Sequence, residues 1–504
     1  MKAILSLDQG TTGGTALVVG SDGHVHARAY SEFTQHFPRP GWVEHDAEEI
    51  WQVTRAMGRD ALESVPDGID VVGIGITNQR ETVVVWDRAT LEPVHRAIVW
   101  QDRRTAGICE SLRKGGHEAD VRARTGLVLD PYFSGTKLTW LMREHPDIRV
   151  RAEEGDLAVG TIDAWLIARL TGGAVHATDP TNASRTLLFD LRARAWSPEM
   201  AALLQVPLHV LPEVRRSSGD FGTATAEVFG RELPIAGVAG DQQAALFGQG
   251  CWNPGLAKNT YGTGAFLLMY TGAEEPRISQ HGLLSTIACA ADGSAGYALE
   301  GSVFVAGAAI QWLRDGLGLI ESSAETEVLA ASVASTDGVS FVPAFVGLGA
   351  PHWDAEARGT ITGLTRGTTR AHLVRAALES MAYRSAEVLE AMQADAGIEL
   401  AELRVDGGAS ANDWLMRFQA EVLGRPVRRP AMVETTALGA AGLAGVQLGV
   451  WSDAEAFLAA AGDAERFEPG DRELAASIDR SAWNRAVEAT RRWAAASAGD
   501  NSEE

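Results

Sequence analysis

Residues 3–19 read AILSLDQGTTGGTALVV: an apolar run, a turn rich in glycine and threonine, and a second apolar run. The two runs, Ala3–Leu7 and Thr15–Val19, have the length and aliphatic content of buried strands. The turn between them, Asp8–Gly14, can point successive backbone N–H groups at one anion, and its glycines let the backbone approach that anion closely. The stretch therefore predicts a strand–turn–strand unit with a candidate phosphate site at its turn.

Asp8 ends the first strand, where its carboxylate could hold a hydrated Mg²⁺, an ion that prefers one or two carboxylates together with phosphate oxygens. The alternative is a plain hairpin turn whose Asp and Thr side chains bond to their own backbone. A second turn of the same type, Thr260–Gly264, favours the phosphate interpretation, because a triphosphate needs more than one turn to bind its phosphates. The chain has no P-loop and no protein-kinase signature set, so ATP chemistry would belong to another fold.

The chain around the first unit predicts a mixed α/β domain. Val25–Phe33 can form a third strand, and Val71–Ile76 is a further apolar strand. Between them, residues 46–65 carry apolar side chains at helical spacing. Asp46 stands at the start of this helix with Glu49 three residues later, which predicts a variant of the capping box.

The second half of the chain repeats this order of elements. Two strands, Ala257–Asn259 and Ala265–Tyr270, flank the second turn, and Leu403–Val405 leads through a Gly-Gly turn into a helical stretch, Asn412–Leu423. Two such units more than 200 residues apart indicate two related domains that face one cleft. We expect an N-terminal domain over residues 1–248, a C-terminal domain over 249–490 and a flexible tail over 491–504.

Composition and charge exclude several classes of protein. At 504 residues the chain is long enough for two to four domains. Its formal net charge of −22 disfavours binding to nucleic acids and anionic membranes. No apolar stretch approaches the 18 residues of a membrane span. The three cysteines, Cys109, Cys251 and Cys289, have no spacing typical of a disulfide framework or a zinc site, which predicts buried, reduced thiols and a cytoplasmic location.

A series of longer motifs makes the prediction specific. In chain order they are LDQGTT at 7–12, PGWVEHD at 40–46, GITNQRET at 75–82, AIVWQ at 97–101, DPYFSGTK at 130–137, TNASRT at 181–186, AGDQQAALFG at 239–248, KNTYGTG at 258–264, GLGAP at 347–351 and RVDGG at 404–408. With these motifs in this order, the chain resembles the FGGY carbohydrate kinases, and among them the members that phosphorylate glycerol. The resemblance spans roughly residues 3–480.

The resemblance implies the fold, the reaction and the partners. The expected fold is α/β, with two actin-like ATPase (ribonuclease-H-like) domains and a nucleotide cleft between them. The expected reaction is the ATP-dependent phosphorylation of glycerol to sn-glycerol 3-phosphate in glycerol catabolism, with ATP as co-substrate and Mg²⁺ as cofactor. The family also implies a cytoplasmic homodimer or homotetramer. Alternatives left open are a kinase for another polyol or ketose, such as xylulose or erythritol, and a non-catalytic actin-like nucleotide-binding regulator.

Candidate site residues follow from the positions that match the family motifs. Asp241 is expected to be the general base, which takes the proton of the attacking hydroxyl. The expected substrate-binding residues are Arg80, Glu81, Trp100, Tyr132, Asp241, Gln242 and Phe266; the nucleotide-binding residues are Thr11, Thr12, Gly13, Thr263, Gly307, Gln311, Gly408 and Asn412; and the metal-associated residue is Asp8.

The chemistry of these side chains suits a small polyol. Arg80 donates hydrogen bonds, Glu81 accepts them, Gln242 can do both, and Tyr132 adds a hydroxyl. A site that pairs every hydroxyl of glycerol rejects analogues that lack one, because its own buried groups are then left unpaired. Each residue also has a structural explanation: a local Arg80–Glu81 ion pair, core packing of Tyr132, or capping of the following helix by Asp241.

Two segments depart from the family pattern. Gly13-Gly14-Thr15 stands where glycerol-phosphorylating members commonly have Ser-Ser-Arg, so a phosphate-site arginine is absent. This change predicts weaker nucleotide binding or a broader choice of phosphoryl donor or acceptor. Residues 226–233 read AEVFGREL and contain Arg231, but they lack the glycine-rich loop with which some members bind fructose 1,6-bisphosphate.

Overall fold

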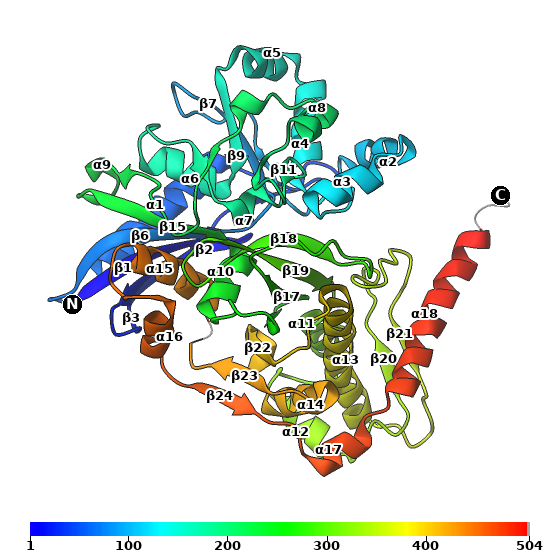
Figure 1. Ribbon diagram of the computed structural model, residues 1–504. Coiled ribbons are helices and arrows are strands. Elements are labelled where there is room, and N and C mark those ends of the chain that lie inside the picture. The colour runs from blue at the N-terminus through cyan, green and yellow to red at the C-terminus, as the bar shows by residue number, and fades with distance from the viewer. Residues whose placement is uncertain (433, 501–504) are drawn as a thin grey trace.

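The computed structural model describes residues 1–432 and 434–500, with the side chains described as far as residue 494. The chain forms two lobes, each built around one mixed β-sheet (Figure 1). The sheet of the first lobe has the strand order β14-β15-β6-β1-β2-β3, and that of the second has the order β18-β19-β17-β16-β22-β23-β24.

The first sheet consists of β1 Lys2–Gln9, β2 Gly13–Gly20, β3 Val25–Glu32, β6 Asp70–Asn78, β14 Thr223–Ala224 and β15 Leu233–Gly240. The second consists of β16 Leu256–Tyr261, β17 Ala265–Gly272, β18 Leu284–Cys289, β19 Ala295–Val303, β22 Glu402–Asp406, β23 Val427–Pro430 and β24 Ala464–Phe467. Smaller sheets are formed by β4 Gln35–His36, β5 Glu44–His45, β7 Val83–Asp87, β8 Ala97–Ile98 and β9 Leu157–Thr161, and by the pairs β10 Ala177–Thr178 with β13 Glu213–Val214, β11 Phe189–Asp190 with β12 Ala195–Trp196, and β20 Ser340–Val342 with β21 Thr360–Thr362.

The helices of the first half are α1 Ala47–Glu63, α2 Ala106–Lys114, α3 Glu118–Thr125, α4 Ser134–Glu144, α5 Pro146–Glu154, α6 Ile162–Leu170, α7 Pro180–Ala183, α8 Pro198–Leu204, the 3₁₀ turn Leu208–Val210, α9 Ala226–Phe229 and α10 Asp241–Gly248. Those of the second half are α11 Gly307–Gln311, continued by a π-helical turn at Trp312–Gly316, α12 Glu325–Ala331, α13 Arg370–Ala396, the 3₁₀ turn η3 Gly408–Ala411, α14 Asp413–Leu423, α15 Thr435–Gln447, α16 Ala454–Ala460, α17 Arg472–Ser477 and α18 Arg480–Asp500.

The two main sheets share one topology. In the first, β1 pairs antiparallel with β2 and parallel with β6, and β2 pairs antiparallel with β3. In the second, β16 has the same relationship to β17 and β22, and β17 pairs antiparallel with β19. The repeat that the sequence predicts is therefore present in the strand pairings. The strands predicted at both turns are confirmed, each within a few residues of its predicted ends.

Both faces of β1 are buried, which explains why its sequence is a continuous apolar run and does not alternate. Ala3, Leu5 and Leu7 pack in the core that contains residues of α1 and α6. Ile4 belongs to a different core cluster, together with Leu438 and other residues of α15. The first sheet is thus covered by helices of its own lobe on one face and by a helix from the C-terminal half on the other.

Helices α10 and α15 cross between the two sheets (Figure 1), and glycine lets them touch. A Cβ on Gly439 would lie 1.9 Å from the carbonyl oxygen of Ala244, and one on Gly248 would lie 2.3 Å from that of Thr435. No real side chain tolerates such distances, so the close approach of the two backbones requires these glycines. Because α10 leads directly from β15 into the C-terminal half, its position fixes the residues at its start relative to both sheets.

The predicted first helix is confirmed as α1, but its cap differs from the predicted one. The Asp46 carboxylate accepts hydrogen bonds from the backbone N–H groups of Glu48 and Glu49, at 2.9 and 3.2 Å. The Glu49 carboxylate does not return the bond; it accepts from the backbone N–H and the hydroxyl of Thr34, at 3.0 and 2.9 Å. Glu49 therefore ties α1 to the preceding loop.

The remaining sequence expectations concern cysteines, membranes and the tail. All three cysteines are buried and unpaired, as predicted. Within the described residues, no helix combines the length and apolar character needed to cross a membrane. Of the predicted tail, the part up to Asp500 belongs to α18, and residues 501–504 lie outside the described residues.

Candidate active site

Parallel strands bring the expected acceptor residues to one edge of the first sheet. Arg80 and Glu81 follow β6, and Asp241 and Gln242 follow β15, its parallel neighbour. Glu81 has a φ of 63°, in the left-handed region that non-glycine residues rarely adopt. Such strain is typical of functional positions, where surrounding contacts hold the residue in place. Together with Tyr132, these four residues form what we call the acceptor cluster.

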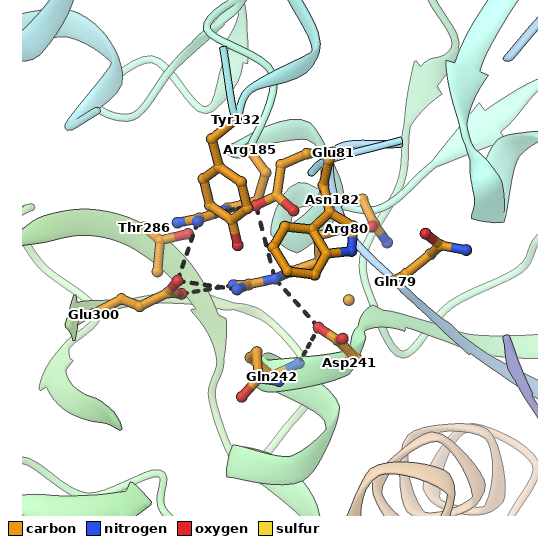
Figure 2. Close-up of polar contacts among 12 residues, drawn as sticks. Gln79, Arg80, Glu81, Tyr132, Asn182, Arg185, Asp241, Gln242, Thr286 and Glu300 are labelled. Carbon is orange, nitrogen blue, oxygen red and sulfur yellow. Dashed lines mark hydrogen bonds and ion pairs between the residues drawn. The ribbon is translucent and has the colours of Figure 1, made fainter. Parts of the chain in front are cut away.

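Arg80 is the centre of the acceptor cluster, and it bonds across both lobes (Figure 2). Its Nε lies 3.2 Å from Oδ1 of Asp241. Its two terminal nitrogens donate to the carboxylate of Glu300, on β19 of the second sheet, at 2.6 and 2.9 Å. A planar guanidinium suits this two-pronged contact, which is stronger and more directional than a single bond. Arg80 thus holds Asp241 while it is itself held from the other lobe.

A second arginine completes the charge network. Nε of Arg185 donates to Glu81 at 2.6 Å, and its Nη2 donates to Glu300 at 3.1 Å. Arg80, Glu81, Arg185 and Glu300 are all buried. Burial alone would raise the pKa of Glu300, but Arg185 and Arg80 outweigh it and hold that pKa at about 2. Glu300 is therefore an anion at neutral pH, and it fixes both guanidinium groups.

Asp241 differs from Glu300 in its environment. Burial raises the pKa of the Asp241 carboxyl, and the Arg80 guanidinium opposes part of that rise. Its Oδ1 also accepts the backbone N–H of Gln242 at 2.7 Å, while 29% of the side chain remains exposed. A carboxylate that is held on one oxygen, partly accessible and raised in pKa has the properties of a general base.

Tyr132 is placed by its own loop and by its neighbours. Its backbone N–H donates to Asp130 at 2.9 Å, and the buried ammonium of Lys137 donates to its carbonyl at 2.7 Å. The ring meets Trp100 edge to face, with centroids 5.5 Å apart, and lies under Arg185. Burial, followed by the charge of Glu81, raises the phenol pKa, so the hydroxyl stays protonated and can donate.

Trp100 connects the acceptor cluster to the first turn. Its indole N–H donates to the hydroxyl of Thr11 at 3.0 Å. Gln79, the residue before Arg80, donates to the carbonyl of Gly10 at 3.0 Å. The structure thus places the Thr11 turn beside the acceptor residues. Asp8, near the end of β1, is partly buried, and Thr12, in the turn that follows, is exposed. Burial, followed by the charge of Asp241, raises the pKa of Asp8 to about 7.

The structure accounts for the departure at Gly13 and Gly14. A Cβ on Gly13 would lie 2.7 Å from the carbonyl oxygen of Ser31 and 2.9 Å from the hydroxyl of Tyr30. A Cβ on Gly14 would lie 2.4 Å from the terminal methyl of Met57. The backbone oxygen of Ser31 therefore leaves no room for a side chain at 13, whereas the contact at 14 is with the movable end of the Met57 side chain.

The second turn is held by the start of α11. The carbonyl of Thr263 accepts from the N–H groups of Ala306 and Ala308, at 2.9 and 3.1 Å. Gly307 donates to Gly262 at 3.0 Å, and a Cβ on Gly307 would lie 2.6 Å from that same carbonyl oxygen. The Thr263 side chain is exposed. The predicted nucleotide position Gly307 therefore fixes the turn by close backbone contact.

The other predicted nucleotide positions lie in the second lobe. Gly408 is exposed on η3, which packs against β16 and β22. Asn412 caps α14 by accepting from Leu415 at 2.8 Å and donates to Thr326 at 3.1 Å. Gln311 is exposed at the end of α11. Phe266, which is predicted to bind the substrate and not the nucleotide, also lies in the second lobe, opposite Thr260 and Ser302 in its sheet.

The buried charged residues of this region that are missing from the predicted set include Arg185, Glu300 and Lys258. Arg185 and Lys258 lie within family motifs, TNASRT at 181–186 and KNTYGTG at 258–264, whereas Glu300 lies in the buried strand β19 outside those motifs. The sequence signal for such a residue is one charged side chain in a strand whose other residues are expected to be buried. Because a buried charge almost always has a partner, this pattern indicates a second charged residue nearby.

Comparisons with known proteins agree with this geometry. The N-terminal domain model of the FGGY family of carbohydrate kinases matches residues 3–248, and the C-terminal domain model matches residues 257–448. A glycerol kinase from Dechloromonas aromatica is 58% identical over 495 residues, which cover 97% of this chain and 98% of that protein. One from Deinococcus radiodurans is 56% identical over 493 residues, with 97% and 98% covered. The solved structure of a glycerol kinase from Plasmodium falciparum with ADP superposes with a TM-score of 0.91, at 36% identity, covering 97% of this chain and 98% of that one. The two-domain α/β fold expected from the motifs is confirmed.

Proposed function

Because the chain belongs to the FGGY family of carbohydrate kinases, we propose that it transfers the γ-phosphoryl group of ATP to a hydroxyl of glycerol, giving sn-glycerol 3-phosphate and ADP. Relatives named glycerol kinase, at 56–58% identity over nearly the whole chain, support this choice among the family's substrates. The observation that carries the proposal is the contact of Arg80 with Asp241 beside Glu81 and Tyr132.

The acceptor cluster can bind the alcohol and take its proton. Glu81 and Arg80 offer an acceptor and a donor, and Tyr132 offers a hydroxyl. Trp100, edge to face with Tyr132, gives an apolar wall for the carbon chain. The attacking oxygen transfers its proton to the Asp241 carboxylate as it forms the new P–O bond, and the bond between the γ-phosphorus and the β–γ bridging oxygen breaks in line with it.

Alignment supplies much of the rate. Holding the two reactants in line can lower the activation barrier by about 7–11 kcal/mol, because it raises their effective molarity. For the donor, we propose that the turns at Thr11–Gly13 and Thr263 hold the phosphates, and that Gly307, Gln311, Gly408 and Asn412 surround the rest of the nucleotide. We also propose the division into a domain over residues 1–248 with the acceptor site and a domain over 249–490 with the nucleotide site.

Mg²⁺ fits the residues present. Asp8 lies near the end of β1 beside the first turn, and burial followed by the nearby charge of Asp241 raises its pKa, so two carboxyl groups face this part of the site. Mg²⁺ is commonly held by one or two carboxylates plus phosphate oxygens, so Asp8 with the donor phosphates is a suitable ligand set. When bound, the ion would neutralise charge that develops on the phosphates.

Location and assembly are further proposals. Three buried, unpaired cysteines suit a reducing cytoplasm. A homodimer or homotetramer is the assembly we propose from the family resemblance, and light scattering on the purified protein would test it.

A substrate panel tests the reaction. ADP release with ATP and Mg²⁺ is measured with glycerol, erythritol, xylulose and gluconate at matched concentrations. We expect the highest kcat/KM with glycerol, by at least about 10²-fold, because paired buried polar groups discriminate strongly among acceptors. A higher value with any other acceptor would move the assignment to that substrate, and no ADP release with any acceptor would favour a non-catalytic module.

A further inference from the structure

Lys258 is a fully buried lysine that reaches from one lobe to the other. It lies on β16 of the second sheet, and its side chain is not exposed to solvent. Its ammonium donates to Oε1 of Gln242, the residue after Asp241, and to the hydroxyl of Thr260 at 2.9 Å. Lys258 is therefore a direct link between the C-terminal lobe and the acceptor cluster.

A buried ammonium is costly unless charges of opposite sign lie near it. Both direct partners of Lys258 are neutral. Burial lowers the pKa of Lys258; the charges of Asp406, Asp241 and Glu300 act against that lowering, and the charge of Arg80 adds to it. Through the β-ladder Lys258 lies opposite Leu268, which in turn lies opposite Glu300, so lysine and glutamate share one face of the sheet. The lysine thus belongs to the same charge network as the expected base.

The contact with Lys258 decides which way the Gln242 carboxamide faces. An ammonium has donors and no acceptor, so only the carboxamide oxygen can face it. The Nε2 group must then point away from Lys258, and it makes no hydrogen bond to any residue that the structure describes. The backbone N–H of Gln242 is bound to Asp241, which keeps the residue beside the base.

We propose that Lys258 is a positioning residue of the transfer reaction: by holding Oε1 of Gln242 from the opposite lobe, it turns the Nε2 group into a hydrogen-bond donor for the acceptor alcohol. The proposal rests on the proposed function and adds to it a direction for Gln242, which by itself could donate or accept. It also makes acceptor binding depend on the contact between the two lobes.

The first test separates positioning from simple structural support. Lys258→Met removes the donors while keeping a long side chain, and Lys258→Arg restores them. We expect Lys258→Met to raise the KM for glycerol about tenfold or more, while its KM for ATP changes less than threefold, and we expect Lys258→Arg to recover most of the loss. Lys114→Met, at an exposed lysine of α2, is the matched control and leaves both constants unchanged.

A double-mutant cycle with Gln242→Ala identifies the path of the effect. Since Lys258 is proposed to act through Gln242, Lys258→Met adds little to the KM for glycerol when Gln242 is already alanine. The proposal is overturned if the KM for glycerol of the double variant rises by the product of the two single effects. It is also overturned if folded Lys258→Met has an unchanged KM for glycerol.

Gln242→Glu keeps the proposal testable if Lys258→Met does not fold. The new carboxylate can still accept from Lys258, so the melting temperature is maintained or raised, but the donor toward the alcohol is lost. We expect a KM for glycerol raised about tenfold, and a KM equal to that of the unmodified chain overturns the proposal. Turnover of glycerol by the unmodified chain tests the proposed function separately; if another acceptor is used instead, the same ratios are measured with that acceptor.

Discussion

Nε of Arg80 lies 3.2 Å from Oδ1 of Asp241, and the terminal nitrogens of the same guanidinium donate hydrogen bonds to the carboxylate of Glu300 in the other lobe. One side chain therefore places the expected base and ties the two sheets together. Catalysis and the stability of the fold therefore both depend on Arg80. Substitutions of its two partners, Asp241 and Glu300, can separate the two effects.

Glu300→Gln removes the anion that both arginines share. Breaking a buried ion pair from one side typically costs about 3–5 kcal/mol, because the remaining charge is left unpaired. We expect the free energy of unfolding to fall by that amount, as measured by urea denaturation followed by tryptophan fluorescence. Glu468→Gln, at an exposed ion pair with Arg466, is the control and should change it by less than about 1 kcal/mol. Equal stability of Glu300→Gln and its control would contradict the central place of Glu300.

Tyr132→Phe removes one hydroxyl and keeps the ring that packs on Trp100. If the phenol donates to glycerol, its loss costs about 0.5–1.5 kcal/mol, the range for a neutral hydrogen bond. Steady-state kinetics should show a KM for glycerol raised about twofold to tenfold, with the melting temperature unchanged. An unaltered KM for glycerol would mean that Tyr132 serves packing alone.

Thr15→Arg introduces the cation that the family resemblance implies at this position. Thr15 lies opposite Asp8 on one side and Tyr30 on the other, next to the first turn. We expect the KM for ATP to fall about threefold, which corresponds to about 0.7 kcal/mol and suits a partly exposed charge contact. Thr15→Gln, long but uncharged, is the control, and a KM for ATP that is the same or higher in Thr15→Arg speaks against the interpretation of this departure.

Asp163 predicts a pH dependence of stability away from the site. Its carboxyl is fully buried, with Oδ1 and Oδ2 accepting from the hydroxyls of Thr161 and Thr178, each at 2.5 Å. Burial, followed by the charge of Asp179, raises its pKa from 3.8 to about 7. A raised acid pKa favours the neutral form in the folded state, so its contribution to stability is fully present below about pH 4 and is lost as pH rises through about 7.

Asp163→Asn cannot ionise and isolates this contribution. Between about pH 4 and 7 the unmodified chain should lose up to ~1.4 kcal/mol per pH unit relative to the variant, as linkage requires. Melting temperatures of both proteins, measured from pH 4.5 to 8, should therefore diverge in favour of the variant. Parallel curves across that range would refute a raised pKa at Asp163.

Some strands, the first helix and the motif residues of the site could be predicted from the sequence, because each has its pattern within a short stretch of the chain. The apolar runs of β1 and β2 and the helix after Asp46 carry their own patterns, and the motif at Arg80 and Glu81 stands directly after a strand. The pairing of Arg80 with Glu300 could not be predicted, because the two residues are 220 positions apart and meet only when the lobes pack. Asp46 could be predicted as the cap of the first helix, but no local pattern indicates that Glu49 bonds to Thr34 instead of returning the capping bond.

Gly13 and Gly14 show the same limit. In the sequence they appear only as the absence of Ser-Ser, whereas in the structure the backbone oxygen of Ser31 lies beside Gly13 and the terminal methyl of Met57 lies beside Gly14. Ser31 comes from the neighbouring strand β3 and Met57 from α1, so these neighbours depend on strand register and helix packing, which a motif does not contain.

The proposed base is tested most directly by Asp241→Asn, which preserves the shape of the side chain and removes its ability to take a proton. In a coupled assay of glycerol-dependent ADP release, we expect kcat to fall by about 10²–10⁴-fold, because general-base catalysis typically accelerates a reaction by that factor. The melting temperature and the KM for ATP should stay close to those of the unmodified chain. Glycerol phosphorylation by folded Asp241→Asn at an undiminished kcat would contradict the account.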